Sequence, residues 1–158
     1  MKGERSRRAG TAGRTVARLA KQVERAIAPL DLSLPQYRVL ALLGDGSTAA
    51  SVLARRLAVS PPSVTALVDG LVARALVERS PDPVDRRRLT LTLTGEGALL
   101  LAAADAAADE RLGELAALAD GDAPALVAAL DGWGRALDRG RDERARGQDG
   151  TAATVPAR

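Results

Sequence analysis

The run from residue 60 to residue 94 places the tightest limits on the fold, because its hydrophobic pattern changes from a helical to an extended period. Ser60 and Pro61 form a typical helix start, with a hydroxyl to cap the first turn and a proline at the first helical position. Apolar residues then recur three and four apart, as on the buried face of a helix; they are Val64, Leu67, Val68, Leu71 and Val72. From Leu89 to Thr94, leucine alternates with threonine, which indicates a half-buried β-strand.

A charged turn separates these two patterns. Residues 82–88 read DPVDRRR and end in three consecutive arginines, which project together from a tight turn. Upstream, Ser47 and Thr48 begin another short helix that stops near Val59, a few residues before Pro61. Two short helices joined so tightly are typical of a helix-turn-helix, although an ordinary helical hairpin has the same spacing. The basic hairpin that follows favours a winged helix-turn-helix.

Further helices are expected on both sides of this region. An apolar stripe predicts a helix over residues 14–28, and a second helix over residues 34–43 is capped by Ser33 or Leu34. A long Ala- and Leu-rich helix follows residue 97, and a last helix carries Leu126, Leu130, Trp133 and Leu137 at heptad-like spacing. We therefore predict a mainly α fold with a small β-hairpin wing. One domain covers residues 13–139, between a flexible basic tail (1–12) and a disordered tail (140–158).

Composition narrows the possible functions. The 158-residue chain is 46% hydrophobic and 27% charged, as folded soluble proteins are, and its scarcity of aromatic residues predicts a core of Leu, Val and Ala. It has no Cys and no His, so we predict no disulfide, no metal site, no cofactor and no catalytic site. No apolar run approaches the roughly 20 residues of a membrane span, and no signal peptide is recognisable, so a cytoplasmic location is expected. The net charge is only +3, but its clustered cations suit a polyanionic partner.

Residues 34–97 resemble the MarR family of bacterial transcription regulators. The most specific marks are Asp85 and Arg87, placed as the family's wing Asp-x-Arg, followed by Leu93, Thr94 and Gly97 where the wing closes. The resemblance implies a homodimer in which residues 13–33 and 98–139 supply the dimerisation helices and residues 34–97 form the winged helix-turn-helix. Each recognition helix would enter a major groove of double-stranded DNA and each wing a minor groove. Binding to a pseudo-palindromic operator would usually repress, and a small ligand often releases such proteins.

The predicted DNA contacts lie on the recognition helix, on the helix before it and on the wing. They are Ser60, Pro62, Ser63, Thr65, Ala66, Asp69 and Gly70, then Arg55, and then Arg86, Arg87 and Arg88. We expect Arg87 to insert into the minor groove, because a guanidinium fits a narrow, electronegative groove. Asp85 is expected to pair with an arginine and hold the geometry of the wing.

Three positions depart from the family pattern. Ala66 and Gly70 replace residues that are often basic in relatives, so base specificity from this helix is expected to be modest. Ala75 stands where relatives often have glycine, so the helix end is either continued or strained there. Asp69 is expected to pair with an arginine of the wing.

Some cations and aromatic residues allow two interpretations. Arg55, Arg56, Arg74 and Arg79 either contact phosphates or lie on a solvated face. Tyr37 either lines a ligand pocket or packs in the core. The alternative function is a winged-helix module that binds another protein; an enzyme is disfavoured, because no nucleophile, base and orienting group converge in a recognisable motif.

Overall fold

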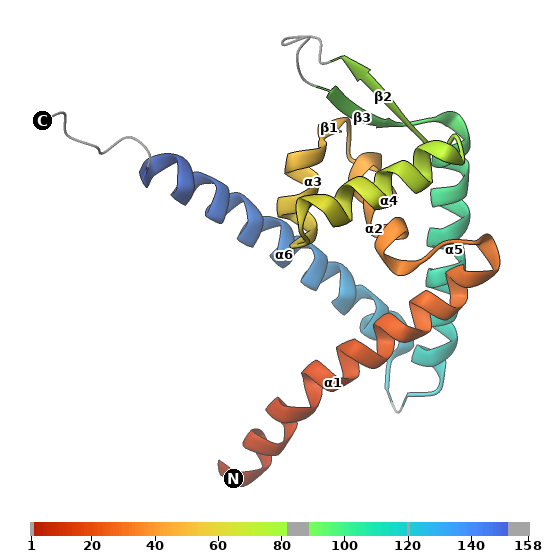
Figure 1. The fold of residues 1–158 in the computed structure, drawn as a ribbon. Coiled ribbons are helices and arrows are strands. Elements are labelled where there is room, and N and C mark those ends of the chain that lie inside the picture. The colour runs from red at the N-terminus through yellow and green to blue at the C-terminus, as the bar shows by residue number, and fades with distance from the viewer. Residues whose placement is uncertain (1, 82–88, 120, 152–158) are drawn as a thin grey trace, which may run out of the picture. The chain divides into compact units, whose positions relative to one another are not determined.

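The computed structural model describes residues 2–81, 89–119 and 121–151. The elements in chain order are α1 (Lys2–Ile27), a short 3-10 helix η1 (Ala28–Leu30), α2 (Leu34–Gly44), β1 (Thr48–Ala49), α3 (Ala50–Leu57), α4 (Pro61–Ala73), β2 (Val77–Pro81), β3 (Leu89–Leu93), α5 (Gly95–Ala117) and α6 (Ala123–Thr151) (Figure 1). The mainly helical fold with a small hairpin is confirmed. The chain divides into two compact units, residues 1–112 and 113–158, and the division falls within α5.

The helix α2 begins at a complete capping box. The Ser33 hydroxyl accepts a hydrogen bond from the Gln36 backbone N–H at 3.4 Å, and the Gln36 side-chain oxygen accepts one from the Ser33 backbone N–H at 3.0 Å. Two N–H groups that have no partner within the helix are satisfied in this way. Of the two predicted caps, Ser33 is therefore the correct one.

An aliphatic core joins α2, α3 and α4 to the sheet. Its most completely buried large side chains are 2% exposed or less; they are Ile27, Leu40, Leu53, Leu71 and Leu91. Helices α3 and α4 pack on each other and on α2, and β3 lies against α2 (Figure 1). Burying each such side chain stabilises the fold by about 1.5–3 kcal/mol relative to leaving it exposed. The predicted core of Leu, Val and Ala is confirmed.

The sheet has one more strand than the predicted hairpin. Strand β3 is central and antiparallel to both neighbours, with Val77 of β2 opposite Leu93 and Thr48 of β1 opposite Leu91. The prediction that Ser47 and Thr48 begin a helix was therefore wrong, since α3 begins at Ala50. The open edge of β3 offers backbone partners to residues 48–49, and these tertiary hydrogen bonds override the weak local helix preference.

The predicted alternation of β3 is only partly reflected in its burial. Leu91 is buried as expected, but Leu89 is 56% exposed and Thr90 only 9% exposed. Because β3 is the central strand, Thr90 is covered by neighbours on both sides, and its hydroxyl donates to the Ser80 carbonyl at 3.2 Å. The strand prediction is confirmed, but not the inward position of its first leucine.

Two helices extend further than the sequence suggested. Helix α1 begins at Lys2 and so includes residues that were expected to form a flexible tail, and α6 continues to Thr151 and not to about residue 139. These segments contain Arg, Ala and Glu, which favour helices, and no proline interrupts them. The boundaries proposed for the domain and its tails remain predictions.

A close backbone contact fixes the junction between the sheet and α5. A Cβ atom at Gly97 would lie 2.0 Å from the Leu76 carbonyl oxygen, so only glycine fits there. The Thr94 hydroxyl accepts from the Gly97 N–H at 3.0 Å and donates to the Ala75 carbonyl at 2.7 Å. The turn after α4 and the start of α5 are thereby joined.

We expect Gly97→Ala to lower the free energy of unfolding by at least about 2 kcal/mol, because the added methyl group forces backbone atoms apart. Gly95→Ala is the matched control: the same change two residues earlier meets no atom within 4 Å. Urea unfolding of both variants measures the difference. Equal midpoints for Gly97→Ala and Gly95→Ala would show that the contact is not constraining.

Candidate nucleic-acid interface

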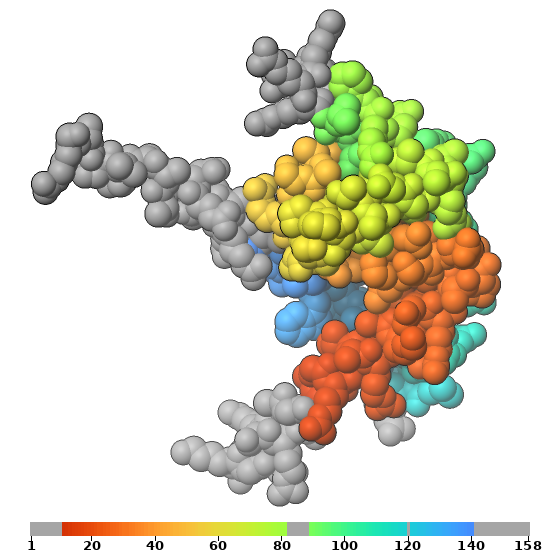
Figure 2. Space-filling model, viewed as in Figure 1, coloured from red at the N-terminus to blue at the C-terminus, as the bar shows by residue number. Residues whose placement is uncertain are grey.

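Helix α4 exposes the side that the sequence assigned to DNA. It buries Val64, Val68 and Leu71, so the opposite side is left to solvent. Of the residues predicted to contact DNA, this helix exposes Pro62, Ser63, Thr65, Ala66 and Asp69. In the space-filling view, α4 lies at the surface beside α3 and the hairpin (Figure 2). The predicted burial pattern is confirmed, while the DNA contacts themselves stay predictions.

Gly70 lies at the margin of this side and faces α2. It is only partly exposed, and a Cβ atom there would lie 3.8 Å from the Gln36 side-chain nitrogen, which is an ordinary contact. An alanine therefore fits without displacement, and nothing in the structure requires glycine at this position.

The first turn of α4 uses its hydrogen-bonding groups internally. The Ser60 hydroxyl accepts from the Ser63 backbone N–H at 3.3 Å and lies 2.8 Å from the Ser63 hydroxyl. Pro61 and Pro62 carry no N–H, so the positively polarised end of this helix has no free backbone donor in its first two positions. A phosphate at this end would meet hydroxyl groups and the helix dipole, not the row of backbone donors found at many anion sites.

The Thr65 hydroxyl already donates a hydrogen bond within α4. It donates to the Pro61 carbonyl at 3.1 Å, and the exposed side chain keeps its oxygen lone pairs and its methyl group for other contacts. Such a side chain can accept from the amino group of adenine or cytosine, or contact a thymine methyl group.

Asp69 forms an ion pair with Arg79 of β2. The expectation that Asp69 pairs with an arginine of the hairpin is confirmed. The pair neutralises a carboxylate that would otherwise repel phosphates, and it joins α4 to the wing strand. Both side chains are more than a third exposed, at 55% and 36%, so the stability gained from the pair is small.

The remaining arginines of this region divide into two groups. Arg55 and Arg56 are exposed in the last turn of α3, where their charges also complement the helix dipole. Arg74 and Arg38 instead bind backbone carbonyls of the protein, those of Asp31 and Leu57 among them. Neither of the two interpretations of Arg74, a phosphate contact or a solvated face, included this contact.

Asp85, Arg86, Arg87 and Arg88 lie outside the described residues, so their predicted roles are unchanged. The structure describes the hairpin as far as Pro81 and Leu89, which are paired directly across β2 and β3. Residues 82–88 therefore connect two strand ends that the sheet holds side by side.

Tyr37 links α2 to α5. Its hydroxyl donates to the Asp105 carboxylate at 2.6 Å. Partial burial, and after it the hydrogen bond to Asp105, hold the pKa of Tyr37 well above its ordinary value, so the hydroxyl remains a donor. Tyr37 packs against the core, which favours the core interpretation.

A surface hollow of about 410 Å³ lies beside the same carboxylate. It is lined by residues of α2, the sheet and α5, namely Leu43, Gly44, Gly46, Ser47, Thr92, Leu93, Ala98, Leu101, Ala102 and Asp105. Tyr37 is not among them, so its predicted place in a ligand pocket stays untested.

The described part of the chain holds neither a candidate metal cluster nor a candidate membrane-spanning helix. Within residues 2–81, 89–119 and 121–151, no group of three or more carboxylate, His or Cys residues is placed to hold a metal ion. Across the same residues, no helix has the length and apolar character that crossing a bilayer requires.

Several polar contacts within the lobe, which is the compact unit of residues 1–112, could not be predicted from the sequence. Tyr37 and Asp105 are 68 residues apart, and Arg111 binds the side chain of Gln22 across 89 residues, at 2.9 and 3.1 Å. Because such pairs follow from the tertiary fold, no local sequence pattern predicts them. The capping box at Ser33 and Gln36 could have been found from the Ser-x-x-Gln spacing.

A helix-turn-helix followed by an antiparallel hairpin, as seen here, defines a winged-helix protein of the DNA-binding type. The sequence profile described as MarR family matches residues 30–88. An uncharacterized HTH-type transcriptional regulator of Mycobacterium bovis is 34% identical over 118 residues, which cover 73% of this chain and 82% of that protein. The chain belongs to the MarR family of transcriptional regulators.

Two solved structures illustrate what similar proteins bind. A MarR mutant from E. coli, complexed with operator DNA, matches with a TM-score of 0.60 at 25% identity, over 75% of this chain and 89% of that one. CouR from Rhodococcus jostii RHA1, bound to p-coumaroyl-CoA, matches with a TM-score of 0.65 at 26% identity, over 79% and 87%. Transcription regulators, not enzymes, make up this family.

The helix exit at Ala75 is strained, which decides between the two expectations for this position. Ala75 has φ 56°, in the left-handed region that glycine adopts without cost. We expect Ala75→Gly to raise the free energy of unfolding by about 0.5–1 kcal/mol, because relief of strain exceeds the extra entropy of the unfolded glycine.

Ala73→Gly is the matched control, since Ala73 is also exposed but lies within α4 and is not among the residues with positive φ. It should lower stability slightly, as glycine does in helices. Thermal and urea unfolding measure both variants, and a loss of stability in Ala75→Gly as large as that in Ala73→Gly would refute the strain.

Proposed function

We propose that this regulator is a homodimer that binds a pseudo-palindromic double-stranded DNA operator and represses transcription, with release by a small ligand. One observation supports the proposal most strongly. The solvent-facing side of α4 lies next to a hairpin whose paired strand ends lead into the sequence DPVDRRR. An uncovered helix can enter a major groove while neighbouring arginines neutralise phosphates or enter a minor groove.

The case for a homodimer comes from apolar side chains that a single chain leaves in water. Val16 of α1 is 65% exposed, and Trp133 and Leu137 of α6 are 71% and 67% exposed. Leu130 belongs to the same heptad-like series on α6, at 39%. Apolar residues repeated along a helix favour a partner helix, and a second copy presents the same series. In this proposal the segments 13–33 and 98–139 dimerise, and residues 34–97 bind DNA.

The wing would supply most of the DNA affinity. Helix α4, from Pro61 to Ala73, contains no Lys or Arg, and its one carboxylate is paired with Arg79. The bidentate arginine–guanine contact, the commonest specific contact, is therefore not available from α4. Arg86, Arg87 and Arg88, with Arg55 from α3, remain as the cations assigned to DNA, and Asp85 as the residue that orients the wing.

An effector would bind on mainly aliphatic surface. The hollow beside Asp105 joins α2, the sheet and α5, which are the elements that position the DNA-binding lobe. The bound p-coumaroyl-CoA of CouR supports the general idea of a small-molecule effector. The alternative is a winged-helix module that binds another protein. The observation that favours it is the absence of Lys and Arg from α4.

Titration against DNA fragments from around the protein's own gene tests the proposed function. A dimer that neutralises about six phosphates should lose affinity with a slope of about −5 in log K against log salt. Anisotropy of labelled fragments at four or more salt concentrations gives this slope. Absence of binding at low salt would contradict DNA binding and leave the protein-binding alternative.

Arg87→Ala should weaken operator binding at least about tenfold, because a cation in a narrow minor groove is lost. Arg25→Ala is the matched control, because it removes the same charge from an exposed position on α1 that lies off the apolar stripe and outside the winged helix-turn-helix. Size-exclusion chromatography should show an unchanged dimer in both variants. Operator binding by Arg87→Ala that equals binding by Arg25→Ala would show that the wing assignment is wrong.

A further inference from the structure

We propose that Arg74 is a positioning residue that ties the end of the recognition helix to the connection between α1 and α2. The tie would hold α4 at a fixed orientation to the helix that leads from the proposed dimer interface. The inference rests on the proposed DNA-binding function for its consequence, but its geometry stands independently.

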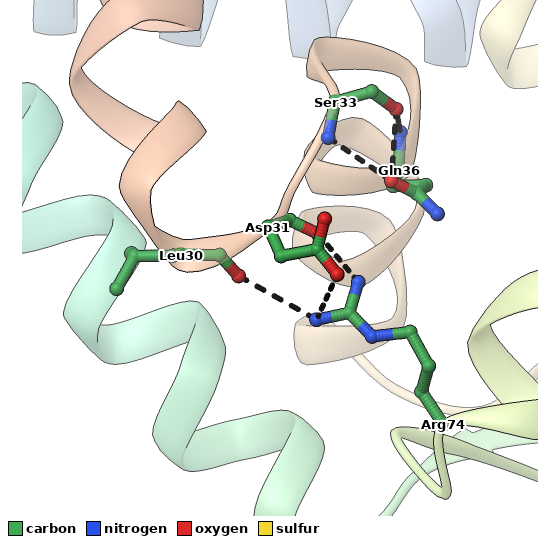
Figure 3. Close-up of polar contacts among 5 residues, drawn as sticks. All are labelled: Leu30, Asp31, Ser33, Gln36 and Arg74. Carbon is green, nitrogen blue, oxygen red and sulfur yellow. Dashed lines mark hydrogen bonds and ion pairs between the residues drawn. The ribbon is translucent and has the colours of Figure 1, made fainter.

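Arg74 reaches back across the fold from the C-cap of α4. Its guanidinium donates to the Asp31 carbonyl at 2.5 Å and to the Leu30 carbonyl at 3.5 Å (Figure 3). The Asp31 carboxylate is 3.8 Å from the same guanidinium. Along the sequence, Arg74 is 43 residues from Asp31 and 44 residues from Leu30, so these contacts join two distant segments.

The two carbonyls belong to a helix end, which explains why a cation is bound there. Leu30 is the last residue of η1, and Asp31 is its C-cap in the left-handed conformation, at φ 54°. Carbonyls at a helix end lack partners within the helix and carry partial negative charge. A planar guanidinium can donate to two of them at once, whereas the point charge of lysine does not match that geometry.

The hydrogen bonds from Arg74 to the two carbonyls contribute more to this contact than the ion pair with Asp31 does. The Arg74 side chain is 31% exposed, but the Asp31 side chain is 94% exposed, so the carboxylate is fully solvated. An ion pair to such a group contributes little to stability. The contact therefore depends on the arginine and on the main chain of residues 30–31, and not on the acidic side chain.

The contact between Arg74 and residues 30–31 has a consequence for DNA binding because of where it lies in the fold. Ile27, at the end of α1, and Leu32, in the connection that follows, are both buried in the core. Arg74 adds a polar attachment to the residues between them, from the C-cap of α4. This added attachment restricts rotation of α4 against the connection, and a recognition helix held in place loses less entropy when it binds.

A phosphate contact by Arg74 makes a different prediction from a positioning role. Loss of a phosphate contact reduces the salt slope by about one, because one fewer counterion is released. Loss of a positioning contact weakens binding by the same factor at every salt concentration. The salt slope therefore distinguishes the two roles directly.

The experiment compares the full chain with Arg74→Ala, Arg74→Lys and Asp31→Asn. Both Arg74 variants should bind operator about tenfold more weakly with an unchanged salt slope, the lysine variant because it does not bridge both carbonyls. Asp31→Asn keeps the carbonyls and tolerates the left-handed conformation, so it should bind as the parent chain does. If Arg74→Ala does not fold, Arg74→Lys carries the test.

A second measurement needs no DNA. Hydrogen exchange at the amides of residues 28–37 should be faster in the Arg74 variants and unchanged in Asp31→Asn. Unchanged exchange and unchanged affinity in both Arg74 variants would overturn the tie, as would a salt slope reduced by one. If the parent chain binds no DNA, the proposed function fails, while the exchange result still decides whether the tie exists.

Discussion

Burial of one aliphatic side of α4 is the constraint on which the rest of the structure depends. Val64, Val68 and Leu71 are buried against the other helices of the lobe, and this burial fixes the direction of the opposite side. Loss of any one of them would cost about 2–4 kcal/mol and would also loosen the orientation of the exposed residues. The orientation of the exposed side of α4 is thus set by the residues that the helix buries, and the residues that face solvent contribute little to it.

Two arginines that the sequence left open to a phosphate contact instead bind groups of the protein. Arg79 neutralises Asp69, and Arg74 binds main-chain carbonyls at the end of η1. Each contact replaces a possible phosphate contact with an internal one that orients a neighbouring element. Of the cations assigned to DNA in the proposal, Arg55 lies on α3 and Arg86, Arg87 and Arg88 lie in the segment 82–88, as expected if affinity depends mainly on the wing.

The sequence predicted the elements of the lobe because their patterns are local. Ser60 and Pro61 begin α4 as expected, the apolar stripe selects its buried side, and the leucine–threonine alternation predicts β3. The strand at Thr48 and Ala49 was missed because its hydrogen bonds come from β3, more than 40 residues later. The contacts of Arg74, Tyr37 and Arg111 were missed for the same reason, since they depend on which segments the core brings together. The strain at Ala75 was one of the two outcomes expected from the sequence, because glycine is the usual residue where a helix ends in the left-handed conformation.

Hydroxyl-radical footprinting of the operator complex tests the central claim most directly. If two α4 helices of a dimer bind related half-sites, the protected regions should lie on one face of the duplex, about 10 base pairs apart and symmetric about their midpoint. Additional protection should appear in the flanking minor grooves and disappear in Arg87→Ala. A single asymmetric protected region, or protection without any regular spacing, would contradict a dimer that reads two half-sites with α4 and the wing.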